Sequence, residues 1–357
     1  MKKVEVLALI ACLLVCFTGC TESGNKTLED DGVFKVAMAP DVGGVNDQSF
    51  NQSAWEGLKE FSKETGSKIT YMESRQTSEF AQNLDKLSDG NYDLILGVGF
   101  SMSDAMYETA LLNLDKTFAL VDFSYGDEAP NNLTSIMFKS EEAAFLVGYI
   151  AGKFTKTNKL GFVGGMKDHI IYQFEYGFKA GVLYAAKEMN KKIEVFSQCA
   201  ESFTDSAKGR AIATKMYGDG CDIIFHASGE VAYGIIEVAK DLNKFVIGVD
   251  RDQSYLAPSV ILTSSMKNVG AAVKIVANKI KNGEDLGGKT LTFGLKDGCV
   301  DIPPRAEFLD QKIYDNALKL KKYISDGQLI IPEGTFTIPD SNESYIRFST
   351  EFEKAMG

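Results

Sequence analysis

The sequence predicts an α/β protein made of two successive halves, each an open, doubly wound sheet covered by helices. Short runs rich in Val, Ile, Leu and Phe alternate with longer helix-like segments along residues 33–325. Strands that are apolar throughout are typical of parallel sheets buried on both faces. The alternation stops at residues 126–132, which include Pro130, and then starts again. Two such cycles predict two lobes with a ligand cleft between them.

In the first half, each short apolar run predicts a strand, and the longer segment that follows it predicts a helix. This order favours parallel strands, because a helix must carry the chain back before the next strand begins. The predicted strands are residues 33–39, 68–73, 92–96, 117–122 and 134–138, and the predicted helices are residues 50–64, 79–87 and 102–114.

The second half repeats this pattern and adds a helix near the end of the chain. Its segments have the lengths expected of a second sheet with helices on both faces. The predicted strands are residues 159–163, 194–197, 222–226, 245–249 and 259–263, and the predicted helices are residues 141–154, 170–189, 206–217, 231–241, 268–282 and 310–325.

The N-terminus has the pattern of an export signal. Lys2 and Lys3 precede an apolar run of twelve residues, 6–17, which is too short to span a bilayer comfortably. Small residues then precede Cys20, as in the lipobox of bacterial lipoproteins. An ordinary secretory signal that happens to contain a cysteine is the alternative.

On the lipoprotein interpretation, residues 1–19 are a signal peptide and Cys20 carries the lipids. Two or more acyl chains would anchor the protein stably, because a single chain binds a membrane only marginally. The following polar, acidic stretch has no periodicity, so residues 20–32 are expected to be the lipidated cysteine and a tether.

Charge and cysteine content exclude several classes. The formal net charge is −11 and no basic stripe is present, so nucleic acid is not an expected partner. No segment after the signal approaches 18 unbroken apolar residues, so no further membrane span is expected. Cys199, Cys221 and Cys299 are odd in number and lack metal-ligand spacing, so free thiols are expected rather than a disulfide framework.

Polar and aromatic residues recur where the predicted strands end. In open α/β sheets a ligand binds beyond the carboxyl ends of the strands. Glycine there lets the backbone approach a ligand, acids and amides bond to its polar edge, and an aromatic ring offers a flat face. The residues concerned are Asp41 with Gly43, Gly44 and Phe50; Gly97 and Gly99 with Phe100; Asp122; Gly164 and Gly165; Phe203 with Asp205; Ser228 with Gly229; and Asp250 with Arg251 and Asp252.

Other chemistries find little support in these loops. Residues 43–52 lack the Lys-Ser/Thr of a phosphate loop, and their carboxylates would repel phosphate. Asp41, Asn46 and Asp47 are oxygen ligands that calcium would accept, but the EF-hand spacing and its closing glutamate are absent. We therefore expect no metal site and no cofactor.

Catalytic motifs are equally scarce. The sequence has no G-x-S-x-G elbow, and acid pairs such as Asp250 and Asp252 are too common to indicate glycosidase chemistry. His226 ends a predicted strand and either faces the cleft or is structural, whereas His169 starts a helix at the surface. Trp55 is expected to pack in the core. The sequence does not favour an enzyme.

Phe50 and Phe203 stand at predicted loops, one in each half. If both rings face the cleft, they could sandwich a planar heterocycle, since stacking a base on an aromatic side chain contributes about 1–3 kcal/mol. Packing beneath their own loops is the alternative, and the residues alone leave the choice open.

Seven segments in order along the chain resemble the basic membrane protein family. They are "DQSFNQSAWEGL", "FALVDFSYG", "EEAAFLVGYIAGK", "KLGFVGGM", "GFKAGV", "VIGVDRDQ" and "ILTSSMKNVG". The family consists of lipoproteins related to purine-nucleoside receptors, the solute-binding subunits of ABC importers. The resemblance implies a type I periplasmic-binding-protein fold, in which three crossovers join two Rossmann-like lobes. It implies an N-terminal lobe of residues 33–138 plus about 255–298, and a C-terminal lobe of residues 139–254 plus about 299–357.

The resemblance also implies roles for single residues. In nucleoside-binding members two Phe side chains hold the purine, and Phe50 and Phe203 match them. The aspartate of "VIGVD", Asp250, and the lysine of "TSSMK", Lys267, match the residues that hold the ribose. The remaining polar contacts around the nucleoside match Asp41, Asn51 and Asp122.

One segment departs from the family pattern. The family has a glycine-rich turn after the strand that corresponds to "DIIF", and this chain has "HASGEVAYG" there. Gly229 remains, and we expect it at the site, but Glu230 replaces a glycine. This substitution puts close backbone approach to the sugar in doubt.

The function implied is capture of a purine nucleoside, such as inosine, guanosine or adenosine, for import by an ABC permease. The expected protein is a monomer, lipid-anchored in a cell membrane and facing the periplasm or the cell exterior. A surface-exposed antigen or adhesion lipoprotein that binds macromolecules is the alternative. An adhesin has no reason to keep Phe50, Phe203, Asp250 and Lys267 together, and this distinguishes the two functions.

Overall fold

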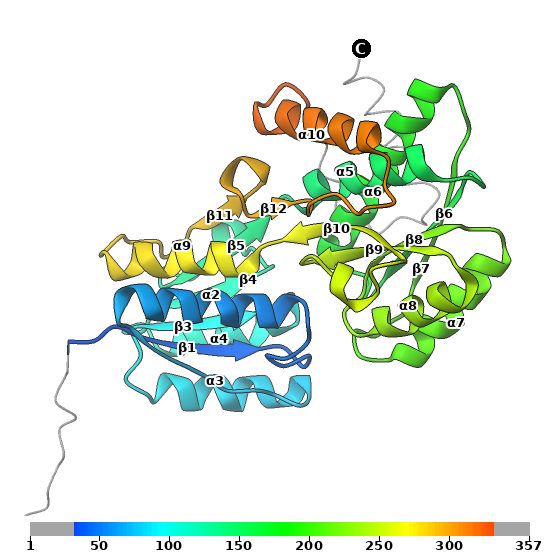
Figure 1. Cartoon of the computed structure of the whole chain (residues 1–357). Coiled ribbons are helices and arrows are strands. Elements are labelled where there is room, and N and C mark those ends of the chain that lie inside the picture. The colour runs from blue at the N-terminus through cyan, green and yellow to red at the C-terminus, as the bar shows by residue number, and fades with distance from the viewer. Residues whose placement is uncertain (1–31, 332–357) are drawn as a thin grey trace, which may run out of the picture. The chain divides into compact units, whose positions relative to one another are not determined.

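The computed structural model describes residues 32–331. The predicted signal peptide, Cys20, most of the predicted tether and the last 26 residues of the predicted C-terminal lobe lie outside the described residues. Within the described part the chain forms two α/β lobes, each built on a six-stranded sheet (Figure 1). The first sheet contains β1 (Lys35–Pro40), β2 (Lys68–Tyr71), β3 (Leu94–Val98), β4 (Phe118–Val121), β5 (Leu133–Phe138) and β11 (Thr290–Phe293). The second contains β6 (Lys159–Gly164), β7 (Glu194–Cys199), β8 (Ile223–Ala227), β9 (Phe245–Asp250), β10 (Ile261–Lys267) and β12 (Val300–Asp301).

The two sheets have the same topology. Their strand orders are β11–β5–β4–β3–β1–β2 and β12–β10–β9–β8–β6–β7. All pairings are parallel apart from that of β12, which runs antiparallel to β10. The described chain passes between the sheets three times: from β5 to β6, from β10 to β11 and from β11 to β12. The prediction of two Rossmann-like lobes joined by three crossovers is therefore confirmed.

Helices connect most of the parallel strands, as the alternating pattern predicts, whereas loops lead from β4 to β5 and from β9 to β10. The strands themselves are buried, and Val36, Met38 and Ile95 in the first sheet have no exposed surface. The helices are α2 (Phe50–Thr65), α3 (Phe80–Ser88), α4 (Ser103–Leu112), α5 (Ser140–Phe154), α6 (His169–Met189), α7 (Ser206–Gly218), α8 (Val231–Leu242), α9 (Val269–Lys281) and α10 (Gln311–Ser325).

The structure corrects the prediction near the end of the chain. Residues 255–298 were expected to belong to the N-terminal lobe, but β10 pairs with β9 in the second sheet. The strand is also longer than the predicted 259–263, because Ser264 and Ser265 continue it although both are polar. The short strands β11 and β12 were not predicted, since neither has an apolar run long enough to indicate a strand.

The helix that follows β10 packs in the first lobe. Figure 1 shows α9 beside α2, and Gly57 and Gly270 lie at their closest approach. A Cβ atom on Gly57 would lie only 2.3 Å from the carbonyl oxygen of Gly270, so neither helix could keep its position with a larger residue there. The chain thus leaves the second sheet at the end of β10 and returns to the first lobe at once.

Candidate functional site

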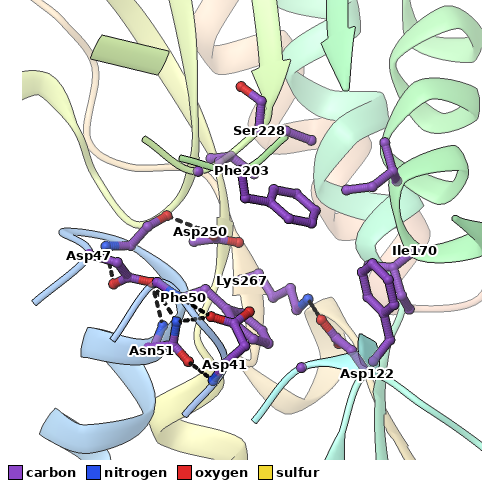
Figure 2. Close-up of a pocket in the computed structure, with 18 of the residues that line it drawn as sticks. Asp41, Asp47, Phe50, Asn51, Asp122, Ile170, Phe203, Ser228, Asp250 and Lys267 are labelled. Atoms are coloured by element: carbon purple, nitrogen blue, oxygen red, sulfur yellow. Dashed lines mark hydrogen bonds and ion pairs between the residues drawn. The ribbon is translucent and has the colours of Figure 1, made fainter. Parts of the chain in front are cut away.

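One pocket collects the residues that follow the strands of both sheets. All eight ligand-binding residues predicted from the sequence line it, although their contact with a ligand stays a prediction. Figure 2 shows side chains from both lobes around this pocket, with Phe203 across it from Asp41 and Asn51. The predicted residues in the lining are Asp41, Phe50, Asn51, Asp122, Phe203, Gly229, Asp250 and Lys267.

The first wall of the pocket is organised around the start of α2. The carboxylate of Asp47 accepts hydrogen bonds from the backbone N–H groups of Ser49, Asn51 and Gln52, at 2.8–3.0 Å. These N–H groups lie at the N-cap and in the first turn of the helix and have no partner within it. A carboxylate at this position also interacts favourably with the positive end of the helix dipole. Asp47 therefore fixes the point at which Phe50 enters the helix.

Asp41 and Asn51 complete this wall. The Asn51 amide donates to Asp41 Oδ1 at 2.7 Å and to Asp47 Oδ2 at 3.0 Å, while its oxygen accepts from the Asp41 N–H at 3.2 Å. Gly43 N–H also donates to Asp41 Oδ1 at 2.9 Å. Burial raises the pKa of Asp41 to about 6, and these two donors to its carboxylate oppose that shift.

A buried ion pair lies deep in the pocket. Lys267, the last residue of β10, donates from Nζ to Asp122 Oδ2, and both side chains are almost fully buried. The ammonium also lies 4.7 Å from the ring centroid of Phe50, 5.1 Å from that of Phe138 and 5.8 Å from that of Phe174. A cation is attracted to the faces of aromatic rings at these distances. Lys267, from the second sheet, thus contacts both a residue that follows a strand of the first sheet and a residue of α6.

The second oxygen of Asp122 has no partner in the part of the chain that the structure describes. Among residues 32–331, Asp122 Oδ1 and Ser228 Oγ are buried and form no hydrogen bond, although both residues line the pocket. Burial raises the pKa of Asp122, and the charge and hydrogen bond of Lys267 oppose this shift. Unpaired buried polar atoms are uncommon in proteins and call for an explanation.

Asp122 and Asp250 occupy equivalent places in the two lobes. Asp122 follows β4 and Asp250 ends β9, the fourth strand of each lobe along the chain. Their φ angles, 71° and 64°, are left-handed, which is unusual for residues other than glycine. Such backbone strain is common at ligand sites. The backbone therefore has the same left-handed conformation at both aspartates.

Asp250 also connects the two lobes. Ser49 Oγ donates to Asp250 Oδ2 at 2.5 Å. Burial raises the pKa of Asp250 to about 6, while the charge of Lys267 and the Ser49 hydrogen bond oppose the shift. One carboxylate of the second lobe thus faces a hydroxyl of the first lobe and the shared ammonium.

Glycines place Phe203 in the pocket. A Cβ atom on Gly165 would lie 2.1 Å from Cε1 of Phe203, so the ring occupies space that only glycine leaves open. Gly229 has a left-handed φ of 57°, and a Cβ there would lie 2.8 Å from the Phe203 carbonyl oxygen. The edge of the ring meets Phe100 of the first lobe, with centroids 6.2 Å apart. Phe50 and Phe203 thus approach the pocket from different lobes.

Sequence reasoning missed part of the lining. Three apolar residues from the first turns of α6 also line the pocket: Ile170, Ile171 and Phe174. A search of strand ends does not find them, because they lie within the helix that follows. Glu230 also lines the pocket, and burial together with the charge of Asp47 raises its pKa.

Other residues considered from the sequence lie elsewhere. Trp55 was expected in the core, but it is only half-buried at the edge of the core, where it packs edge-on against the exposed Tyr71 with centroids 4.9 Å apart. His226 is fully buried in β8, where burial lowers its pKa to about 4. Cys199, Cys221 and Cys299 are free thiols.

The family model for ABC transporter substrate-binding proteins of the PnrA-like type (Bmp) matches residues 34–335. The chain belongs to this family. It is 39% identical to basic membrane protein A of Borreliella afzelii, covering 94% of this chain and all of that protein. It is 38% identical to the ABC transporter nucleoside-binding protein BmpA of Lactococcus lactis, covering 91% and 96%. The family is a class of substrate-binding proteins and not of enzymes.

Solved structures show the same fold. An ABC transporter solute-binding protein from Aeropyrum pernix superposes with a TM-score of 0.78 at 24% identity, covering 90% of this chain and 98% of that one. A second solute-binding protein, from Conexibacter woesei, gives 0.68 at 18% identity, covering 84% and 99%. The type I periplasmic-binding-protein fold is confirmed. Within residues 32–331, no helix has the length and apolar character needed to span a bilayer.

Proposed function

We propose that this protein captures purine nucleosides in the pocket as a monomer and delivers them to an ABC permease. A lipid on Cys20 would hold it at the membrane, facing the periplasm or the cell exterior. The observation that carries the proposal is the pair Phe50 and Phe203, which enter one pocket from different lobes among polar side chains. The Lactococcus relative that is named as a nucleoside-binding protein supports it.

The base would lie between the rings of Phe50 and Phe203. Stacking on aromatic faces does not depend on the base, because every base has a π-face. Asp41 and Asn51 lie on the same wall as Phe50 and could bond to the polar edge of the base. Their own network already fixes their orientation, so binding would cost little further ordering.

The ribose would lie near Asp250, Lys267 and Asp122, whose Oδ1 forms no hydrogen bond among residues 32–331. An ionised carboxylate accepts hydrogen bonds from hydroxyl groups, and an ammonium donates to their oxygens. Asp122 Oδ1 and Ser228 Oγ, buried without partners among residues 32–331, could be satisfied by a ligand rich in hydroxyl groups. This provides a physical reason for two unpaired atoms in one pocket.

The charges of the pocket favour an unphosphorylated ligand. Its described lining holds five carboxylates and a single ammonium, that of Lys267, which is already paired with Asp122. A phosphate group would be repelled by this field and would have to lose its water without gaining a free cation. A neutral nucleoside avoids both costs. The carboxylates are Asp41, Asp47, Asp122, Glu230 and Asp250.

A surface antigen or adhesin is the other function considered. A relative from Listeria monocytogenes, 38% identical over 84% of this chain and 88% of its own length, is named a CD4+ T-cell-stimulating antigen. Macromolecule binding would not require strained aspartates and unpaired buried atoms inside a pocket. We therefore favour solute capture.

Mass spectrometry of small molecules that co-purify with the protein tests the proposal. Protein isolated under native conditions and then denatured should release a purine nucleoside in near-stoichiometric amount. The Phe50→Ala and Phe203→Ala variants, prepared in the same way, should release much less. Release of a different class of metabolite by the wild type, reduced in the same variants, would show that the pocket binds something else.

A further inference from the structure

Three exposed leucines lie at the end of α4, away from the pocket. The exposed fractions are 48% for Leu111, 81% for Leu112 and 73% for Leu114. Single exposed apolar residues are normal on a protein surface, but a contiguous group marks an interaction site more often. We call these three residues the leucine edge.

The leucine edge lies at the end of the first lobe where the chain enters. Helix α4 starts near the carboxyl ends of the strands and therefore ends near their amino ends, where β1 begins. The contacts agree: Lys116, just after the leucines, donates to the Gly90 carbonyl oxygen at 3.1 Å. Asp93, three residues beyond Gly90, accepts from the N–H of Lys35 at 2.6 Å. The leucine edge and the first residue of β1 thus belong to one surface.

The second lobe has no such group at the equivalent place. Helix α8 follows β8 as α4 follows β3, and it ends with Leu242, which is 47% exposed. Its neighbours there are charged: Lys240 and Asp241 are exposed, and Lys244 follows after one residue. The apolar edge is therefore confined to the lobe that carries the predicted tether.

We propose that the leucine edge contacts the lipid bilayer to which the chain is anchored. The inference rests on the proposed lipid at Cys20. Residues 21–33 would separate that lipid from the start of the first lobe, and an extended chain spans at most about 3.3–3.6 Å per residue. The entry surface therefore stays within about 45 Å of the bilayer and can reach it. Apolar side chains at the interface add to the binding provided by acyl chains.

Tryptophan fluorescence in vesicles tests this contact. The chain has a single tryptophan, Trp55, so the Trp55→Phe variant is a background without tryptophan that keeps an aromatic ring beside Tyr71. Leu112→Trp in that background is the probe, and Leu242→Trp is the matched control in the second lobe. Full-length acylated protein is reconstituted in phosphatidylcholine vesicles with and without brominated acyl chains.

The Leu112→Trp probe should show a blue-shifted emission and lose much of its intensity in brominated vesicles, whereas the Leu242→Trp control should show neither effect. Cys20→Ser should abolish quenching of the probe, because one small apolar edge without the anchor binds weakly. Nucleoside binding, measured on each variant, reports on folding.

Acylated protein whose probe behaves like the control would overturn the bilayer contact alone. A mass spectrum without acyl groups on the N-terminal peptide would overturn both the anchor and the contact, and would leave nucleoside binding untouched. A blue shift that appears without vesicles and grows with protein concentration would assign the leucine edge to a second copy of the chain, and would also overturn the contact.

Discussion

The two sides of the pocket differ in how their polar groups are used. On the first-lobe wall, the Asn51 amide donates to both Asp41 and Asp47, and Asp47 accepts from N–H groups at the start of α2. Elsewhere in the lining, Asp122 Oδ1 of the first lobe and Ser228 Oγ of the second have no partner among residues 32–331. The first wall therefore provides a fixed shape, whereas Asp122 of the first lobe and Ser228 of the second have hydrogen-bonding capacity left for a ligand.

The largest effect should come from the ammonium that joins the two sides. Lys267→Met would leave Asp122 buried without its charge partner, and breaking a buried pair in this way costs about 3–5 kcal/mol. Denaturant unfolding should show this loss, and nucleoside binding should disappear. Lys179→Met is a matched control, because Lys179 pairs with Glu175 at 2.6 Å, buried and outside the pocket lining. The control should lose stability but keep its ligand. If the Lys267→Met variant binds nucleoside with wild-type affinity, Lys267 does not contact the ligand.

The aromatic pair should have the next largest effect. Phe50→Ala and Phe203→Ala should each weaken nucleoside binding by about 1–3 kcal/mol if each ring stacks on the base. Without ligand, both should destabilise the fold less than Phe61→Ala, since a core Phe→Ala substitution costs about 3–5 kcal/mol and Phe61 is fully buried. Calorimetry and thermal unfolding measure the two quantities. Unchanged affinity in both pocket variants would mean that these rings only pack beneath their loops.

Removing the Asp47 carboxylate from the start of α2 should have a smaller effect, mainly on stability. Asp47→Ala deletes the acceptor of three N–H groups at the start of α2, and loss of a helix cap costs about 0.5–2 kcal/mol. Thermal unfolding should show this loss. Affinity should fall less than in the Phe50→Ala variant, because Asp41 still holds Asn51. A greater loss of affinity than in that variant would show that Asp47 contacts the ligand directly.

How far the sequence predicts this site depends on how each residue is placed. Asp41, Asp122 and Asp250 follow buried strands, so the apolar runs alone locate them at one edge of a sheet. Phe174 is invisible to that reasoning, because it reaches the pocket from within α6. The sheet to which β10 belongs also could not be predicted, because its pairing with β9 is seen only in the fold. The sequence predicts a strand there, but the polar residues Ser264 and Ser265 hide where it ends.

The pairing of side chains could not be predicted either. The family resemblance implies that Lys267 and Asp250 hold the ribose together, yet the ammonium bonds to Asp122. The partner depends on which carboxylate lies closest once both lobes are folded. Ser49, which bonds to Asp250 across the lobes, carries no signal in the sequence beyond its place before a helix.

A change of pH should act in opposite directions on stability and on binding. Asp41 and Asp250 have pKa values raised to about 6 by burial, above the ordinary value of 3.8. The folded state therefore binds protons more tightly than the unfolded state between about pH 4 and pH 6. The free energy of unfolding of the ligand-free protein should rise as the pH falls through this range.

Nucleoside affinity should fall over the same range. Protonation removes the negative charge of Asp250, and the neutral carboxyl group no longer accepts two charge-assisted hydrogen bonds from the ribose. One proton changes the dissociation constant by at most about tenfold per pH unit. Titrations from pH 7 to pH 4.5 measure this, and Asp250→Asn should remove most of the dependence. An affinity that increases on acidification would contradict the role of an ionised Asp250.

The most direct test of nucleoside capture is calorimetric titration of the wild type and the Asp250→Ala variant with inosine, 2′-deoxyinosine and hypoxanthine. The wild type should prefer inosine to both others, because a buried acceptor left unpaired costs about 1–3 kcal/mol. Asp250→Ala should lose most of that preference and keep its preference among bases, which depends on Phe50 and Phe203. If the wild type binds all three compounds equally, Asp250 does not recognise ribose and the nucleoside assignment loses its main polar support.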